Sequence, residues 1–107
     1  MILRNYTPHT VKVITENQTF EYPSVGVARV KEITENIGDL SGVPLVKRRY
    51  GIVENLPEEK EDVMYIVSLL VFQSSNRTDL LCPDTGSDSV IRDEKGNIIV
   101  VKRLIIK

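Results

Sequence analysis

The sequence has little of what many enzymes and secreted proteins depend on: one cysteine, one histidine and no tryptophan among 107 residues. A single cysteine, Cys82, excludes an internal disulfide, and the N-terminus lacks the charged and apolar regions of a secretory signal. No apolar run reaches the ~20 residues that a membrane-spanning helix needs. We therefore expect a cytoplasmic protein with no membrane partner.

An excess of charge of one sign is missing as well. With 14 basic and 15 acidic residues the formal net charge is −1, so the broad positive field of a nucleic-acid binder is absent and we expect no nucleic-acid polymer as partner. A basic cluster at 47–49 and an acidic one at 58–62 are interpreted as solvated surface. Length and even composition predict one domain over residues 1–107, and its modest core makes a homo-oligomer an expected source of stability.

Strand patterns dominate the first half of the chain. Apolar and polar residues alternate over residues 1–33, and turn residues interrupt them, which predicts about three short strands. The polar residues of 34–42 predict a connector, and 43–53 predicts a further strand. Residues 56–62 predict a charged loop, because Pro57 disfavours helix before it and no apolar periodicity follows.

The second half begins with the most hydrophobic stretch. Residues 63–68 predict a buried strand, and 69–76 either extend it or, as we favour, form a short helix that carries Leu69, Leu70 and Phe72 inward. Residues 77–88 are rich in Pro, Gly, Ser and Asp and predict a loop.

The C-terminal residues predict an antiparallel hairpin. Its strands are 90–92 and 98–106, with Gly96 in the turn at positive φ. The last strand is apolar on both faces, which indicates a central or interface position. The whole pattern predicts an α+β fold, mainly β, in which a curved antiparallel sheet or small barrel carries one short helix.

Chemical motifs are scarce. The sequence has no glycine-rich phosphate loop, nucleophile elbow, Cys/His metal cluster or readable carboxylate pair, so we expect no cofactor, no metal and no catalytic residue. Cys82 lies between Leu81 and Pro83 and is interpreted as a buried, inert thiol. His9 precedes a strand, where an imidazole can transfer a proton, contact an anion or simply fix the turn beside Pro8.

The densest polar segment, residues 68–88, is where a binding site is most expected. The guanidinium fork of Arg77 matches the geometry of a phosphate or a carboxylate, and nearby hydroxyl and carboxylate groups can hold a ribose or a base edge. The alternative is that Arg77 and Asp79 form a structural ion pair that pins a long loop.

Three stretches carry a resemblance to a family, and they are Asn5-Tyr6-Thr7-Pro8-His9, then Leu56-Pro57 with Tyr65-Ile66-Val67-Ser68, then Arg77-Thr78-Asp79 with Pro83-Asp84-Thr85-Gly86 and Arg92-Asp93-Glu94-Lys95-Gly96. Over nearly its whole length the chain resembles small proteins encoded by phages, prophages and mobile elements of bacteria that begin with an Asn-x-Thr-Pro-His-like turn.

The resemblance implies a role against host defence. Small phage proteins of this size counter such defences, and one strategy is to sequester nucleotide immune signals such as cyclic ADP-ribose isomers or cyclic dinucleotides. This implies a non-catalytic homo-oligomer with pockets shared between subunits. Arg77 would contact phosphate, and His9 and Thr7 would contact phosphate or ribose. The implied ligand-binding set is Thr7, His9, Ser68, Arg77, Asp79, Asp84 and Thr85.

Two other functions are compatible with the residues. In an enzyme that cleaves the same signals, His9 would be a general acid or base and Arg77 would stabilise charge. In a protein-binding or virion-associated module, the apolar final strand would pair with a partner's edge strand.

Overall fold

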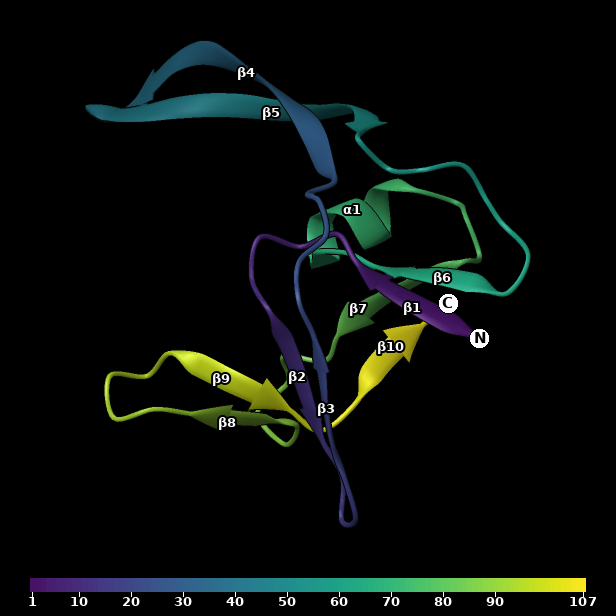
Figure 1. Cartoon of the computed structure of the whole chain (residues 1–107). Coiled ribbons are helices and arrows are strands. Elements are labelled where there is room, and N and C mark those ends of the chain that lie inside the picture. Colours follow the sequence, from purple (N-terminus) through teal and green to yellow (C-terminus); the bar gives the residue numbers. More distant parts are fainter.

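The computed structural model describes residues 1–107, apart from the side chain of Ile99. Strands hold 51% of the residues and one six-residue helix holds 6%, which confirms a mainly β, α+β fold. The elements follow one another along the chain as β1 (Ile2–Asn5), β2 (Val11–Ile14), β3 (Thr19–Tyr22), β4 (Arg29–Leu40), β5 (Val43–Glu54), β6 (Val63–Ile66), α1 (Leu69–Ser74), β7 (Leu80–Pro83), β8 (Val90–Arg92), β9 (Ile98–Val101) and β10 (Leu104–Ile106) (Figure 1).

Two four-stranded sheets form the part of the molecule that we call the body. The first has the order β1-β6-β7-β10, with β1, β6 and β7 parallel and β10 antiparallel. The second has the order β3-β2-β9-β8, with β2 and β9 parallel and the other pairs antiparallel. The sheets are therefore mixed where we expected antiparallel pairing, and in the described backbone neither is closed into a barrel. Parallel partners lie far apart in sequence, and a period-two pattern does not identify them.

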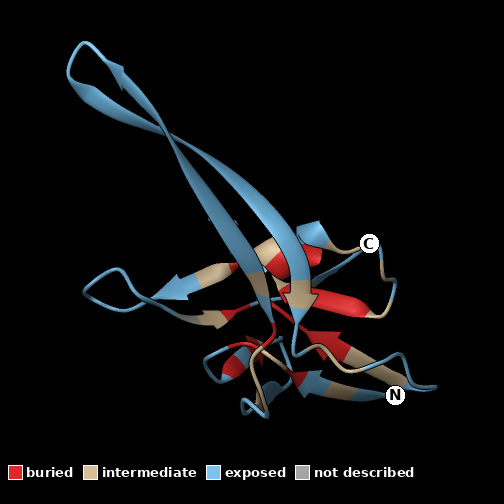
Figure 2. Cartoon of the chain, turned by 90° about the horizontal axis from the view of Figure 1, so that it is seen from above, coloured by how far each residue is buried: buried red, intermediate tan, exposed pale blue. Residues whose placement is uncertain are grey.

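The third sheet is a two-stranded hairpin, β4–β5, which projects from the body and which we call the arm (Figures 1 and 2). The predicted connector over 34–42 is wrong, because β4 continues to Leu40 before a two-residue turn. Ser41 and Gly42 in that turn have φ of 52° and 85°, the positive values that a tight type I′ turn requires. Polar residues over 34–42 thus mark a solvated strand as well as a turn.

The second half of the chain agrees with its predictions in part. The short helix is confirmed as α1, with Ser68 as its N-cap, and Phe72 is buried, but Leu69 remains 51% exposed because it precedes the buried face of the helix. The predicted loop over 77–88 is wrong at its centre, where β7 pairs with β6 and β10 inside the first sheet. The apolar residues of β7 are buried by β6 and β10, which are distant in sequence. The local composition of residues 77–88 does not reveal these partners.

The C-terminal hairpin is confirmed, and Gly96 has φ of 85° in its turn. The predicted final strand divides into two. β9 lies centrally in the second sheet between β2 and β8, as its apolar pattern indicated, and β10 crosses to the edge of the first sheet. The backbone of Ile99 belongs to β9, but its side chain lies outside the described residues.

The core has two parts, one on each face of the first sheet. Successive side chains of a strand point to opposite faces. Tyr65 and Leu80 therefore enter a cluster that α1 and the base of the arm cover, whereas Ile66 and Leu81 enter a cluster with the second sheet. The first sheet is thus buried on both faces, which explains why its central strands are almost wholly apolar.

Candidate functional site

A cavity of about 260 Å³ opens where the two sheets and the start of α1 meet. It is lined by residues from loops and strands of both sheets, namely Thr7, His9, Thr10, Val11, Lys12, Ser68, Leu69, Pro83, Thr85, Ile98, Val100 and Val101. Four of the seven ligand-binding residues predicted from the sequence are among them. A concave site with an apolar wall and a few polar groups is the usual form of a small-molecule site.

The position of these four residues follows from the topology. Thr7 and His9 follow β1, Ser68 follows β6 and Thr85 follows β7. Because β1, β6 and β7 are parallel and adjacent, their carboxyl ends meet at one edge of the sheet. In open sheets of parallel strands, ligands bind outside the carboxyl ends of the strands.

Buried Asn5 organises the loop that carries Thr7 and His9. Its side-chain amide donates to the carbonyl oxygens of His9 and Tyr22, each at 2.7 Å. Its Oδ1 accepts from the backbone N–H and the hydroxyl of Thr7, at 2.9 and 2.7 Å. The Asn-x-Thr-Pro-His turn therefore fixes the conformation of the loop. The imidazole of His9 is exposed, and the hydrogen bonds of Asn5 hold the backbone that carries it.

The Thr7 hydroxyl has little hydrogen-bonding capacity to spare. It lies within hydrogen-bond distance of Asn5 Oδ1 and, at 2.9 Å, of the His9 carbonyl oxygen, so its proton is committed within the loop. Its oxygen can still accept a hydrogen bond from a ligand. Ser68 differs, because its Oγ accepts from the Val71 N–H at 3.4 Å and its proton can be donated.

Two lining groups escaped the sequence reasoning. Lys12 brings a flexible cation to the rim, where it also pairs with Glu21 at 3.2 Å with both side chains about half exposed. The apolar wall includes Val100 and Val101 of β9, which reach the site through the pairing of Val13 with Val101. That parallel contact joins residues 88 positions apart, so the local pattern around Lys12 carried no signal of it.

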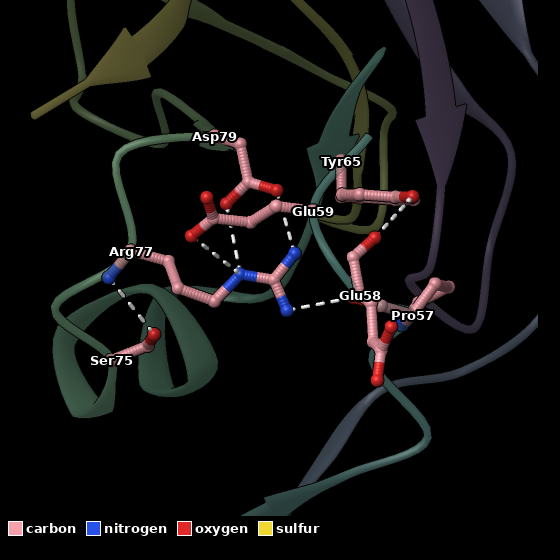
Figure 3. Close-up of polar contacts among 7 residues, drawn as sticks. All are labelled: Pro57, Glu58, Glu59, Tyr65, Ser75, Arg77 and Asp79. Carbon is pink, nitrogen blue, oxygen red and sulfur yellow. Dashed lines mark hydrogen bonds and ion pairs between the residues drawn. The ribbon is translucent and has the colours of Figure 1, made fainter. Parts of the chain in front are cut away.

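Arg77 and Asp79 lie elsewhere, in a cluster between α1 and β7 at the opposite end of the parallel strands (Figure 3). Arg77 Nε and Nη2 donate to the two carboxylate oxygens of Asp79 at 2.9 and 2.6 Å, and Nη1 donates to the Pro57 carbonyl at 2.7 Å. The guanidinium also lies 5.7 Å from the centre of the Tyr65 ring. The hydrogen bonds to Asp79 raise the pKa of Arg77.

This arrangement has the form of the structural ion pair that was the alternative interpretation. Only 23% of the Arg77 side chain and 13% of the Asp79 side chain are exposed. Through the hydrogen bond to Pro57, the pair joins the 56–62 loop to the start of β7. Arg77 and Asp79 are not among the residues that line the cavity. A direct ligand contact by Arg77 or Asp79 stays a prediction.

Asp84 also follows β7 but turns toward Arg103. Its Oδ2 accepts from Arg103 Nε at 2.6 Å, and its Oδ1 accepts from the Gly86 N–H at 3.0 Å. These contacts, that with Gly86 first, lower the pKa of Asp84. Asp84 thus holds the loop that carries Thr85 and is not one of the groups that line the cavity.

Cys82 is fully buried in the first core cluster, as predicted, and burial raises the pKa of its thiol. His9 is exposed at the cavity, so the structure does not bring the two together as a nucleophilic pair. Among the described residues, no group of three or more His, Cys, Asp or Glu side chains is arranged to hold a metal ion. The described part of the chain contains no helix long and apolar enough to cross a membrane.

Comparison with protein-family models, with curated proteins and with solved structures found no match to this chain.

Proposed function

We propose that the protein binds a small nucleotide-type ligand in this cavity and sequesters it. The ligand class that the family resemblance implies is a cyclic ADP-ribose isomer or a cyclic dinucleotide, and its removal would inhibit bacterial defence. The observation that supports binding best is the convergence of three loops at the carboxyl ends of parallel strands. Those loops bring four of the seven expected ligand-binding residues to the cavity.

The chemistry of the lining fits a ligand with an apolar and an anionic part. Leu69, Val100 and Pro83 offer a surface for a base, and hydroxyl groups of Ser68 and Thr85 can hydrogen-bond to a ribose. His9 and Lys12 can donate to phosphate oxygens from the rim. A cavity of about 260 Å³ is small for a complete dinucleotide, so the second nucleotide of such a ligand would lie outside the mouth of the cavity.

The test is to mix the purified protein with a panel of cyclic dinucleotides and ADP-ribose derivatives and to record melting temperatures. A ligand held only by the folded state must stabilise it, so we expect a rise in melting temperature for a member of the panel. Each sample is then denatured and the released nucleotide is identified. Intact ligand supports sequestration, altered nucleotide supports cleavage instead, and no shift across the panel contradicts the proposal.

Substitutions locate the ligand. Thr85→Trp fills the mouth of the cavity and should abolish the shift, whereas Thr78→Trp, at a residue that is also exposed but does not line the cavity, should retain it. His9→Ala removes a hydrogen bond to phosphate and should weaken binding about ten- to a hundredfold. If Arg77→Ala weakens binding while His9→Ala does not, the phosphate lies at the Arg77 cluster and the cavity is not the site.

A further inference from the structure

The arm leaves its apolar side chains in water. Every residue from 31 to 52 is exposed (Figure 2). Eight of these residues are large and apolar. These eight are Ile33, Ile37, Leu40, Val43, Leu45, Val46, Tyr50 and Ile52, with Leu40 67% and Val43 61% exposed beside the turn. The register places Leu40, Val43 and Leu45 together on one face beside the turn, whereas Val46 and Tyr50 lie on the other face. Exposed apolar patches mark interaction surfaces in natural proteins.

The area of the molecule indicates how much of it a partner must cover. Its exposed surface is 7645 Å² for a mass of 12.1 kDa, whereas a monomeric protein of that mass exposes about 6,000 Å². The excess is roughly 1,600 Å² per chain, or roughly 3,200 Å² for two chains, which falls within the range of obligate homodimer interfaces. The radius of gyration agrees, at 16.5 Å against about 13 Å for a compact domain of this length.

The arm has no support of its own beyond its base. An isolated two-stranded hairpin is at best marginally stable in water, and this one extends over two 12-residue strands. Val30 and Val53 at its base pack on the body core, but the rest of the ribbon does not. Its stability therefore requires a surface that covers the outer part.

The charges of the arm favour a second copy of the same chain. Residues 29–54 carry five basic and four acidic side chains, so the arm lacks the single sign of charge that a nucleic acid or an anionic membrane would select. The acids lie mostly on β4 and three consecutive bases on β5. Two-fold pairing of β5 with its own copy would bring the bases of residues 47–49 together, so contact through the faces is favoured over pairing through that edge.

We propose that the arm is a dimerisation arm, which packs lengthwise and antiparallel against the arm of a second copy of this chain. A parallel arrangement would force two bodies into the ~10 Å spacing of packed sheets, whereas an antiparallel one separates them. The tip of one arm then reaches the base of the other. There a second cavity of about 410 Å³, lined in part by Val27, Val30 and Leu70, lies between α1 and β4 and can receive the apolar tip.

Sedimentation equilibrium of the full chain tests the dimer. We expect a mass close to twice 12.1 kDa at micromolar concentration. The double variant Leu40→Glu/Val43→Glu should raise the dissociation constant at least about a hundredfold, because it puts two charges into the contact. Val25→Glu, at a side chain 55% exposed outside the arm, should not. A monomeric native chain, or a double variant that dimerises like the native chain, would overturn the proposal.

Crosslinking tests the antiparallel arrangement. Lys31 and Leu40 lie nine residues apart on one strand, about 30 Å, so a short thiol crosslinker cannot join them within a chain. Mixing Lys31→Cys with Leu40→Cys should give a crosslinked heterodimer. Cys82, which is fully buried, stays unreacted in both. Crosslinks only between two Leu40→Cys chains would overturn the antiparallel arrangement, and the proposed cavity ligand has no part in either experiment.

Discussion

The body and the arm are built from the same β-forming residue types, but every buried side chain among the described residues lies in the body. In the body, Tyr65 is 1% exposed and lies edge-on to Tyr6, with ring centroids 5.6 Å apart. In the arm, Tyr50 is 48% exposed. No buried side-chain nitrogen or oxygen among the described residues lacks a hydrogen-bond partner. The body therefore holds the packed core, and the arm reaches that core only at Val30 and Val53.

The difference shows that strand propensity and strand burial are separate properties of a sequence. Alternation of apolar and polar residues indicates that a strand has two unlike faces. It does not indicate whether the apolar face packs against the chain's own core or against another molecule. The stability of the single chain resides in the body. In the proposed dimer, the apolar residues of the arm would add stability through the contact with the partner's arm.

The largest expected effect comes from exchanging the two tyrosines for alanine. Tyr65→Ala removes a ring from the first core cluster and should lower the free energy of unfolding by about 3–5 kcal/mol. Tyr50→Ala, made in the monomeric Leu40→Glu/Val43→Glu background, should change it by no more than about 0.5 kcal/mol. Urea unfolding of the variants and their parent measures both values.

The outcome that contradicts this comparison is a similar loss in the two variants. It would mean that the arm contributes to the folding of its own chain. The same pair made in the native background adds a check, because Tyr50→Ala should then matter only as far as it weakens the dimer, and its cost should fall on dilution.

The ion pairs of body and arm provide the next comparison. Arg77→Ala leaves Asp79 as a mostly buried charge without its bidentate partner, so we expect a loss of about 3 kcal/mol. Arg48 on the arm contacts Glu32 at 4.0 Å and Thr34 at 3.3 Å with its side chain 49% exposed, and Arg48→Ala should cost less than about 1 kcal/mol. Thermal and urea unfolding of the two variants compare them.

A conservative variant separates charge from geometry at the same place. Arg77→Lys keeps the charge but not the fork that matches both oxygens of Asp79, so it should recover part of the loss and not all of it. Full recovery would assign the effect to charge alone, and no recovery would assign it to the hydrogen bonds to Asp79 and Pro57.

The fold was predictable where its causes are local. The C-terminal hairpin, the charged 56–62 loop and the helix that begins after Ser68 all depend on residues close in sequence, and the structure confirms them. The division of residues 98–106 into two strands of different sheets, and the strand within 77–88, depend on partners far along the chain. Polar composition misled the prediction at 34–42, because an arm strand in water tolerates polar residues.

The candidate site was predictable in the same measure. The family resemblance implied Thr7, His9, Ser68 and Thr85 as ligand contacts, and the parallel topology brings these four to one cavity. The sequence could not reveal that Arg77 lies at the other end of those strands, since that depends on strand direction. Nor could it reveal Lys12, whose place at the rim depends on the partner of its own strand.

The smallest expected effect concerns the charge pairs that tie the loop after β7 to Arg103, in the connection between β9 and β10. Arg103 donates to Asp84 at 2.6 Å and to Asp88 at 2.7 Å. The Gly86 N–H and then Arg103 lower the pKa of Asp84, and Arg103 lowers the pKa of Asp88. A carboxylate with a lowered folded pKa adds stability above its ordinary pKa of about 4, and that contribution disappears as the pH falls through the folded value.

Melting temperatures of the native chain and of Arg103→Gln between pH 7 and pH 2 measure this contribution. We expect the native chain to be more stable at pH 7 and the two curves to converge in acid, because protonated carboxyl groups no longer distinguish the two side chains. Arg48→Gln on the arm is the matched control. If the curves for Arg103→Gln and the native chain stay parallel down to pH 2, Arg103 acts through packing and not through its charge. The position of the loop that carries Thr85 would then depend on the hydrogen bond from the Gly86 N–H to Asp84 and on Ser89, which is fully buried.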